Sequence, residues 1–261
     1  MPKNTIKNTI LELKQVTKIY EGKVIHRALN RLDFEAEEGE FIAIMGPSGS
    51  GKTTFLNIIS TIDMPTYGQV VIDGIEPESL NGNELALFRR RNFGFVFQDI
   101  NLLHMLTVEE NIVLPLTLDG LPVSEMKRRV ARLSDQLTLN EILNRRPDEL
   151  SGGQAQRTAV GRALIHKPKL ILADEPTGNL DSKSAKEVLE LLGHINQTER
   201  ATIIMVTHDP IAASYCDRVL FIKDGEFFNE IYKDERRQTF FQRILNVLSL
   251  LGGNVNDLRT M

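Results

Sequence analysis

The stretch FIAIM-GPSGSGKT, residues 41–53, decides the fold of this chain. Its first half is a continuous apolar run, which predicts a β-strand buried on both faces. Its second half fits the pattern G-x-x-x-x-G-K-[ST], whose glycines let successive backbone N–H groups turn inward and surround phosphate oxygens. Lys52 places a charge on the β- and γ-phosphates, and the Thr53 hydroxyl can ligate Mg²⁺. The candidate nucleotide-binding residues of this loop are Gly46, Pro47, Ser48, Gly49, Ser50, Gly51, Lys52, Thr53 and Thr54.

A second apolar run, LILAD at 170–174, ends in two acidic residues. Asp174 is placed to hold Mg²⁺, and Glu175 to orient and deprotonate an attacking water molecule. In isolation, adjacent acids at a strand end would be read as a solvated turn. Their occurrence downstream of a phosphate-binding loop favours the catalytic interpretation.

The segment LSGGQ, residues 150–154, opens a predicted helix. Ser151 is a good helix N-cap, so a capped helix with flexible glycines is one interpretation. Glycines in a first turn are costly unless a ligand approaches the backbone closely. One nucleotide seldom needs two helix N-termini in a small domain, so the simpler account gives each site one N-terminus from each of two chains. The candidate nucleotide-binding residues here are Ser151, Gly152, Gly153 and Gln154.

The remainder of the chain alternates apolar strand-like runs with helical periodicity. ATIIMV and VLFIKDGE read as strands, and Ser184–Asn196 reads as a helix between strands, which together predict a mostly parallel α/β sheet. The segment from about Gln98 to Pro147 has a helical texture and reads as an inserted subdomain. Leu11–Tyr20 and Arg27–Glu37 show loose alternation, which predicts strands exposed on one face.

Composition narrows the classes of function. The net charge of −4 provides no overall basic field for nucleic acid or an acidic membrane surface. The single cysteine, Cys216, reads as a buried thiol of a reducing compartment. The N-terminus shows no signal-peptide core, and nowhere do about 18 consecutive apolar residues occur, so we expect any membrane path to be formed by another polypeptide.

In these motifs the chain resembles the ATP-binding cassette (ABC) family, whose Walker A, signature and Walker B segments match 46–53, 150–154 and 170–175. The resemblance covers nearly the whole chain, and three further segments match in order. Gln98 in VFQD lies at the family's Q-loop, Asn179-Leu180-Asp181 at its D-loop, and His208 in VTHDP at its switch histidine. Tyr20 lies where the family's adenine-stacking aromatic residue occurs.

The resemblance also implies roles for these residues. Gln98 would contact Mg²⁺ and the attacking water, His208 would contact the γ-phosphate, and Asp181 would communicate across a dimer. The implied fold is a P-loop NTPase with a RecA-like parallel-sheet core, a small antiparallel β subdomain and an inserted helical subdomain. We predict one domain, with a core at about 1–97 and 158–235, a helical subdomain at about 98–157 and a helical tail at about 236–261.

Some segments resemble one branch of the family. PTGNLDSKSA and NLLHMLTVEENIVLPL are similar to the group of macrolide exporters, lipoprotein-release ATPases and antimicrobial-peptide resistance ATPases. ATIIMVTHDPIAASYCDRVLFIKDGE and RRQTFFQRIL are similar to the bacitracin-resistance (BceA-like) ATPases. This implies an ATP- and Mg²⁺-dependent homodimer on the cytoplasmic face of the membrane. It would drive a separate permease for antimicrobial-peptide export or target release, often beside a sensor kinase, and would bind no nucleic acid. A lipoprotein-release, macrolide-export or cell-division complex remains the alternative.

Two related classes fit less well. A DNA-maintenance ATPase would carry a long coiled coil between the Walker A and signature segments, and the spacer in this sequence is too short for one. A translation-acting ABC protein would carry two cassettes in one chain, whereas this sequence has one. In the tail, Phe240, Ile244, Val247, Leu248 and Leu251 form a helical stripe. We expect this stripe to pack on its own domain or on the dimer mate rather than on lipid.

Overall fold

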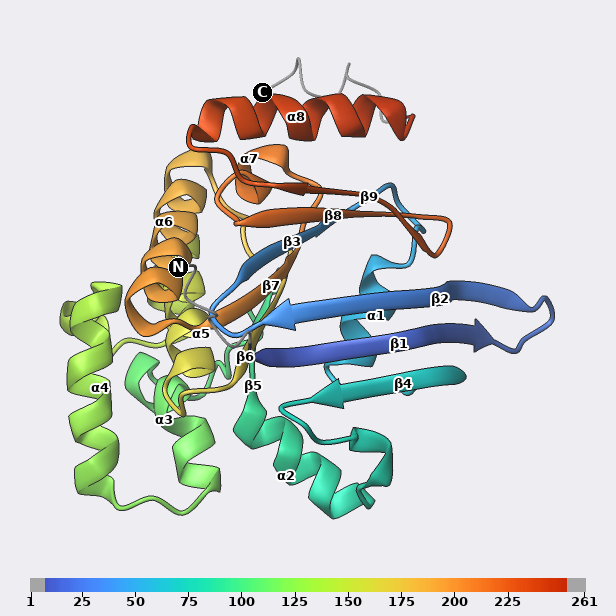
Figure 1. Cartoon of the computed structure of the whole chain (residues 1–261). Coiled ribbons are helices and arrows are strands. Elements are labelled where there is room, and N and C mark those ends of the chain that lie inside the picture. The colour runs from blue at the N-terminus through green and yellow to red at the C-terminus, as the bar shows by residue number, and fades with distance from the viewer. Residues whose placement is uncertain (1–7, 253–261) are drawn as a thin grey trace, which may run out of the picture.

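The computed structural model describes residues 8–252 and is built around a six-stranded sheet (Figure 1). The strand order is β5-β6-β7-β3-β8-β9, in which only the last strand runs antiparallel to its neighbour. These strands are β3 (Phe41–Met45), β5 (Phe93–Phe97), β6 (Leu170–Asp174), β7 (Thr202–Val206), β8 (Arg218–Lys223) and β9 (Glu226–Tyr232). The predicted parallel α/β core is confirmed.

The continuous apolar run of β3 is explained by burial on both faces of this sheet. Because side chains alternate across a strand, Phe41, Ala43 and Met45 join one hydrophobic cluster, whereas Ile42 and Ile44 join another. The first cluster lies under helices α3 to α6 and α8, and the second lies under α1 (Lys52–Ile59) and a separate small sheet. All five residues of the strand are buried, as the sequence predicts.

The small sheet is antiparallel, with the order β2-β1-β4. Its strands are β1 (Thr9–Tyr20), β2 (His26–Glu37) and β4 (Tyr67–Ile72). Alternate side chains such as Leu11, Leu13 and Phe34 face the core, which confirms the loose alternation seen in the sequence. Figure 1 shows the long β1–β2 hairpin extending past α1.

The segment of chain that connects β5 to β6 is mostly helical. They are α3 (Val108–Leu118), α4 (Val123–Leu137) and α5 (Gly152–Leu164), with short 3₁₀ turns η2 (Asn140–Ile142) and η3 (Pro147–Glu149). This agrees with the predicted inserted helices. Because α5 continues without a break through residue 157, the boundary of the helical subdomain at that residue stays a prediction.

The sequence analysis did not anticipate α2 (Gly82–Asn92), which follows the turn η1 (Pro77–Ser79). Phe88 is its one buried residue, so the helix has almost no apolar periodicity. The detectable signal was a capping box, in which Asn81 accepts from the Glu84 amide and the Glu84 carboxylate accepts from the Asn81 amide.

The remaining helices lie toward the C-terminus. They are α6 (Ser182–Glu199), α7 (Pro210–Ala213) and α8 (Arg237–Leu250). Phe240, Ile244, Val247 and Leu251 are buried in the cluster that also contains side chains of α7 and β8, so the tail stripe packs on its own domain, as one of the two expected arrangements. Residues 253–261 of the predicted tail lie outside the described residues.

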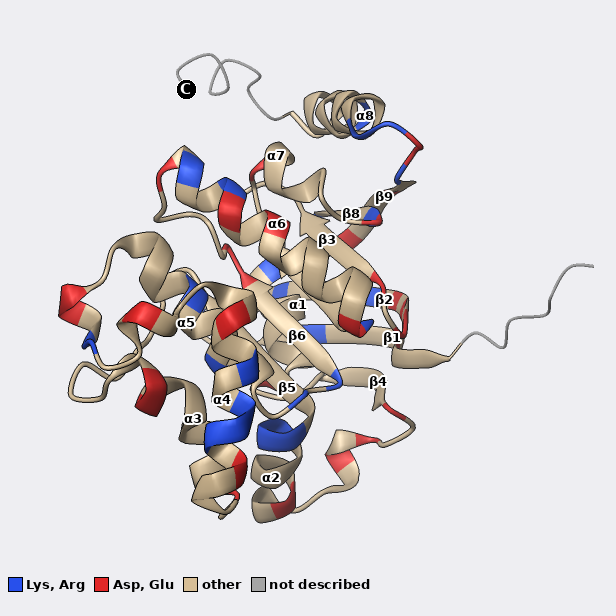
Figure 2. Ribbon diagram, turned by 90° about the vertical axis from the view of Figure 1, so that its left-hand side faces the viewer, with Lys and Arg blue, Asp and Glu red and all other residues tan. Residues whose placement is uncertain are grey.

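Positions of Lys and Arg and of Asp and Glu are interspersed along the helices and connecting segments (Figure 2). On α4, Glu125 pairs with Arg128 and Arg129, and these hydrogen-bonded ion pairs lower the pKa of its carboxyl to about 2. Beside α2, Asp119 pairs with Arg90. Cys216 is fully buried, as predicted. Within residues 8–252, none of the helices combines the length and apolarity that crossing a bilayer requires.

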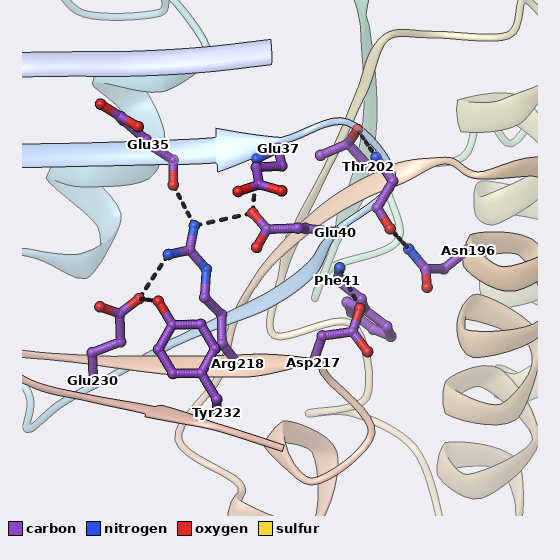
Figure 3. A network of polar contacts seen from close by, with 11 residues as sticks. Glu35, Glu37, Glu40, Phe41, Asn196, Thr202, Asp217, Arg218, Glu230 and Tyr232 are labelled. Carbon is purple, nitrogen blue, oxygen red and sulfur yellow. Dashed lines mark hydrogen bonds and ion pairs between the residues drawn. The ribbon is translucent and has the colours of Figure 1, made fainter. Parts of the chain in front are cut away.

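Arg218 joins the small sheet to the core through a buried polar network (Figure 3). Its guanidinium donates to Glu230 at 2.6 Å, to Glu40 at 3.1 Å and to the Glu35 carbonyl, and it lies 5.3 Å from the centroid of the Phe34 ring. Burial raises the pKa of Glu40, and the Arg218 charge opposes that rise. Arg218 therefore compensates the desolvation of Glu40 and also pairs with Glu230.

Replacing Arg218 with Met is expected to lower the free energy of unfolding by about 3 kcal/mol, because Glu40 is left half-buried without its cation. Loss of the cation raises the folded-state pKa of Glu40 further above its unfolded value. The ionised form then costs stability as pH rises through that range, so the deficit should be smaller at about pH 5 than at about pH 8. Urea denaturation at both pH values measures this difference. Arg243→Met is the matched control, because its ion pair with Asp234 is about 40% exposed and should be worth less than about 1 kcal/mol.

Candidate nucleotide-binding site

Strand register places the predicted site residues along one edge of the sheet. Phe97 pairs with Asp174, Asp174 with Val206, and Val206 with Ile44, so four parallel strands end side by side. The residues that follow these ends are Gln98, Glu175, Thr207 with His208, and Gly46. Ligands of open parallel sheets bind at this carboxyl edge, and four motifs that are far apart in the sequence meet there.

The loop from Gly46 to Gly51 has a backbone that other residues could not adopt. Gly49 and Gly51 have φ of 77° and 107°. A Cβ atom on Gly51 would lie 2.5 Å from the Ala28 carbonyl, and one on Gly46 would lie 2.1 Å from the Ile222 carbonyl. The loop is therefore pressed against β2 and β8, with Pro47, Ser48 and Gly49 exposed on its outer side. The glycines serve both the turn and the packing.

Helix α1 begins directly after this loop, and its N-terminus has no side-chain cap. The uncapped N–H groups and the positive end of the helix dipole suit an anion. The Ser50 hydroxyl is buried and has no hydrogen-bond partner among the described residues. An orphaned buried hydroxyl in a turn of N–H groups fits a phosphate cradle.

Lys52 lies across the mouth of the loop. Its ammonium donates to the Gly46 and Pro47 carbonyls, both at 2.9 Å. Burial lowers the pKa of Lys52, and the charges of Glu175 and Asp174 oppose this. The ammonium is therefore held at the loop, within the electrostatic field of both acids.

Asp174 and Glu175 occupy different environments although they are adjacent. The half-buried Asp174 carboxylate has no hydrogen bond or ion pair within residues 8–252. Burial is the main cause that raises the pKa of Asp174, the negative charge of Glu175 raises it further, and the positive charge of Lys52 lowers it. A desolvated carboxylate facing a lysine beside a phosphate cradle fits a divalent cation. Thr53 is exposed at the start of α1, as a second ligand would need to be.

Glu175 contacts the predicted switch histidine. Its Oε1 lies 2.8 Å from His208 Nδ1. Glu175 has φ of 46°, in the left-handed region, and its N–H donates to the Val206 carbonyl at 2.9 Å. The backbone thus turns sharply at this residue and directs its carboxylate across to the end of β7. The His208 side chain is 73% exposed and open to a ligand.

Gln98 contacts the predicted D-loop. Its Nε2 donates to Asn179 Oδ1 at 3.3 Å, and Asn179 Nδ2 donates back to the Gln98 carbonyl at 3.2 Å. The motifs expected at Gln98 and Asn179 therefore meet in space. Asp181 caps α6 by accepting from the Lys183 and Ser184 amides.

Tyr20 ends β1 and is 39% exposed. The Tyr20 hydroxyl donates to Asp63 at 2.9 Å. Burial and the contact with Asp63 raise the pKa of Tyr20, whereas the nearby Thr54 side chain lowers it. Thr54 belongs to the first turn of α1, so the ring lies beside the phosphate-binding loop. Sequence reasoning did not find Asp63, because a single acid in a loop carries no pattern.

The signature segment forms a separate part of the surface. Ser151 caps α5 through a reciprocal pair with Gln154, at 3.3 Å and 2.9 Å. Within residues 8–252, no hydrogen bond or ion pair joins 151–154 to the loop at 46–54. Ser151 and Gly152 are exposed, whereas a Cβ atom on Gly153 would lie 2.8 Å from Ser184 Oγ. Packing against α6 is therefore a second reason for that glycine, besides approach of a ligand.

A parallel sheet whose carboxyl edge carries this loop, lysine and acid pair defines a P-loop nucleoside triphosphatase. The family model described as ABC transporter matches residues 29–178. The chain belongs to the ABC transporter family. It is an ATP-binding subunit that hydrolyses ATP, with the ABC ATPase fold.

Three similar proteins illustrate the range of the family. The ABC transporter ATP-binding protein YxdL of Bacillus subtilis is 57% identical, over 97% of this chain and 98% of its own length. The bacitracin export ATP-binding protein BceA of Halalkalibacterium halodurans is 49% identical, over 95% and 99%. The dimeric structure of the cassette MJ0796 of Methanocaldococcus jannaschii, in a post-hydrolysis state with ADP and Pi, has a TM-score of 0.78 at 42% identity and covers 87% of this chain and 100% of its own.

Proposed function

We propose that this chain is the motor subunit of an antimicrobial-peptide resistance transporter, in which two copies pair head to tail around two ATP molecules and drive a separate permease. One observation carries the head-to-tail part of the proposal. Each chain presents a phosphate-binding loop with its acids at the sheet edge, and a second exposed helix N-terminus at Ser151 that makes no polar contact with that loop. A second copy supplies the missing half of each site. The dimeric state of the similar cassette MJ0796 supports this arrangement.

In the composite site, residues of one chain perform the chemistry. Glu175 accepts the proton of the attacking water, since its carboxylate is oriented by His208 at 2.8 Å. Lys52 and the amides of 46–53 hold the phosphates and offset the charge that develops during transfer. Thr53, Asp174 and Gln98 would hold Mg²⁺, which when bound would supply positive charge at the phosphate oxygens. Ser151, Gly152, Gly153 and Gln154 of the other chain close the site.

The membrane partner and the transported compound are inferred from similarity. A relative with the printed function of bacitracin export is 49% identical over nearly the full chain, which favours a peptide-antibiotic role over lipoprotein release, macrolide export or cell division. The proposed place of action is the cytoplasmic face of the membrane, against a permease and in some cells near a sensor kinase. Stimulation of ATPase activity by bacitracin, in the complex of this chain with its co-purified permease, tests the assignment. Stimulation by a macrolide or a lipoprotein instead would contradict it.

The head-to-tail arrangement predicts complementation between two inactive variants. Ser151→Arg blocks the signature and Lys52→Ala removes the phosphate lysine, so each homodimer should be inactive. In an equal mixture about half of the dimers are mixed, and each has one intact composite site. We expect the mixture to regain up to about a quarter of the wild-type hydrolysis rate.

The controls separate pairing from folding. Ser151→Thr keeps the N-cap of α5 and should retain activity. Ser151→Arg also removes this N-cap, which costs about 1 kcal/mol of stability. The thermal stability of each variant is therefore measured in parallel. Mixed dimers are verified by pulling down one differently tagged subunit with the other. If mixed dimers form and hydrolysis stays at the level of the separate variants, the two halves of a site do not come from different chains.

A further inference from the structure

The ring of Tyr20 is held by a small polar cluster that the proposed mechanism does not use. Asp63, in the loop after α1, accepts from the Tyr20 hydroxyl at 2.9 Å through one carboxylate oxygen. Its other oxygen accepts from the Lys18 ammonium at 2.5 Å and from the Met64 amide at 2.8 Å. Both oxygens of this carboxylate are engaged, in three hydrogen bonds that fix two side chains and its own loop.

The cluster fixes both the position of the ring and the charge beside it. The Lys18 ammonium, which also donates to the Met64 carbonyl at 2.8 Å, lies 5.0 Å from the centroid of the Tyr20 ring. The ion pair is largely shielded, with 13% of the Lys18 side chain and 28% of the Asp63 side chain exposed. Lys18 occupies one face of the ring as a cation–π partner. The 39% exposure of Tyr20 leaves surface available for a planar ligand.

The loop that carries Asp63 is itself tied to β1. The Thr66 amide donates to the Thr17 carbonyl at 2.8 Å, and the Ile19 amide donates to the Thr66 hydroxyl at 2.9 Å. Asp63 therefore has a fixed position relative to Tyr20, and its loop follows directly from α1, the helix that begins at the phosphate-binding loop. The cluster sets the distance between the aromatic ring and the phosphate-binding loop.

The geometry points to Asp63 and Lys18 as positioning residues for base recognition: they hold Tyr20 so that its free face stacks a purine, while the cation behind the ring favours an electron-rich base. This inference rests on the proposed ATP site and deepens it. Stacking of a base on an aromatic side chain is worth about 1–3 kcal/mol, which corresponds to about 5- to 150-fold in affinity. Phosphate binding at 46–53 does not involve the cluster.

The test separates the base from the phosphates. Dissociation constants for Mg·ATP and for Mg·tripolyphosphate, which lacks a base, are measured by calorimetry for the wild type, Asp63→Asn and Lys18→Met. Asp63→Asn should weaken ATP binding about 10-fold and leave tripolyphosphate binding unchanged, so that KM for ATP rises while kcat is kept. Lys18→Met should weaken ATP by a smaller factor, also with tripolyphosphate unchanged. Asp73→Asn is the matched control, because its carboxylate pairs with Lys169 on the surface and should affect neither ligand.

Tyrosine emission gives a second readout that a merely structural role would not change. The chain has no tryptophan and four tyrosines, so stacking on Tyr20 should appear as ATP-dependent quenching that Tyr20→Phe abolishes. We expect Asp63→Asn to lose most of this quenching. Equal weakening of ATP and tripolyphosphate, or unchanged ATP affinity and quenching in Asp63→Asn, would overturn the inference. If wild-type protein bound neither ligand, the proposed ATP site itself would fail, which is a different outcome.

Discussion

Glu175→Gln is expected to bind ATP with near-normal affinity and to hydrolyse it about 100- to 10,000-fold more slowly than the wild type. The amide has the shape of the carboxylate and can still accept a hydrogen bond from His208, whose Nδ1 lies 2.8 Å from Oε1. It cannot take a proton from water. The substitution therefore removes the base and keeps the geometry, so the ATP-bound dimer should accumulate.

Two measurements check this expectation. Steady-state release of phosphate gives the rate, and size-exclusion chromatography with Mg·ATP gives the fraction of dimer. Glu190→Gln is the matched control, because Glu190 pairs with Lys186 at 3.7 Å on α6 and both side chains are more than half exposed. Turnover of Glu175→Gln within a few-fold of the wild type would exclude Glu175 as the general base.

Lys52→Ala is expected to reduce ATP hydrolysis by at least about 100-fold, comparable to the loss of one preorganised donor at a developing negative charge. Lys52 is the cation held over the loop, since its ammonium lies 2.9 Å from the carbonyls of Gly46 and Pro47. Its removal also leaves the raised pKa of Asp174 without the opposing lysine charge. Both effects weaken the site for a triphosphate with its cation.

The control for this variant is Lys186→Ala. The Lys186 side chain is two-thirds exposed, and its ammonium lies 3.7 Å from the Glu190 carboxylate. Hydrolysis and binding of a fluorescent ATP analogue are measured for both proteins. Undiminished steady-state hydrolysis by Lys52→Ala would refute the assignment of residues 46–53 as the phosphate cradle.

Much of the site could be predicted because its residues are local in sequence. The loop at 46–53, the acids Asp174 and Glu175 and the cap at Ser151 depend on backbone turns of a few residues, and each leaves a short pattern. Helix α2 was missed for the complementary reason: a helix that buries only Phe88 leaves no apolar periodicity. The sequence pattern gave only one reason for glycine at position 153, the approach of a ligand. The structure adds a second reason, because a Cβ atom there would lie 2.8 Å from Ser184 Oγ.

Other parts of the site depend on contacts between distant segments. The Glu175–His208 pair spans 33 residues, the Gln98–Asn179 pair spans 81, and the Tyr20–Asp63 pair spans 43. The sequence placed five of these six residues in motifs but could not show which side chains touch. Asp63 lay outside every motif.

By itself, the sequence determined that this chain has a glycine-rich loop of the phosphate-binding pattern, an acid pair and a further helix N-terminus capped by Ser151, because each is specified by neighbouring residues and their backbone preferences. Only the tertiary structure decided how they are arranged. The register of β5, β6, β7 and β3 aligns Phe97, Asp174, Val206 and Ile44 across the sheet. Parallel register is set by hydrogen bonds between strands far apart in the chain and by side chains packed on both faces, and neither leaves a local pattern.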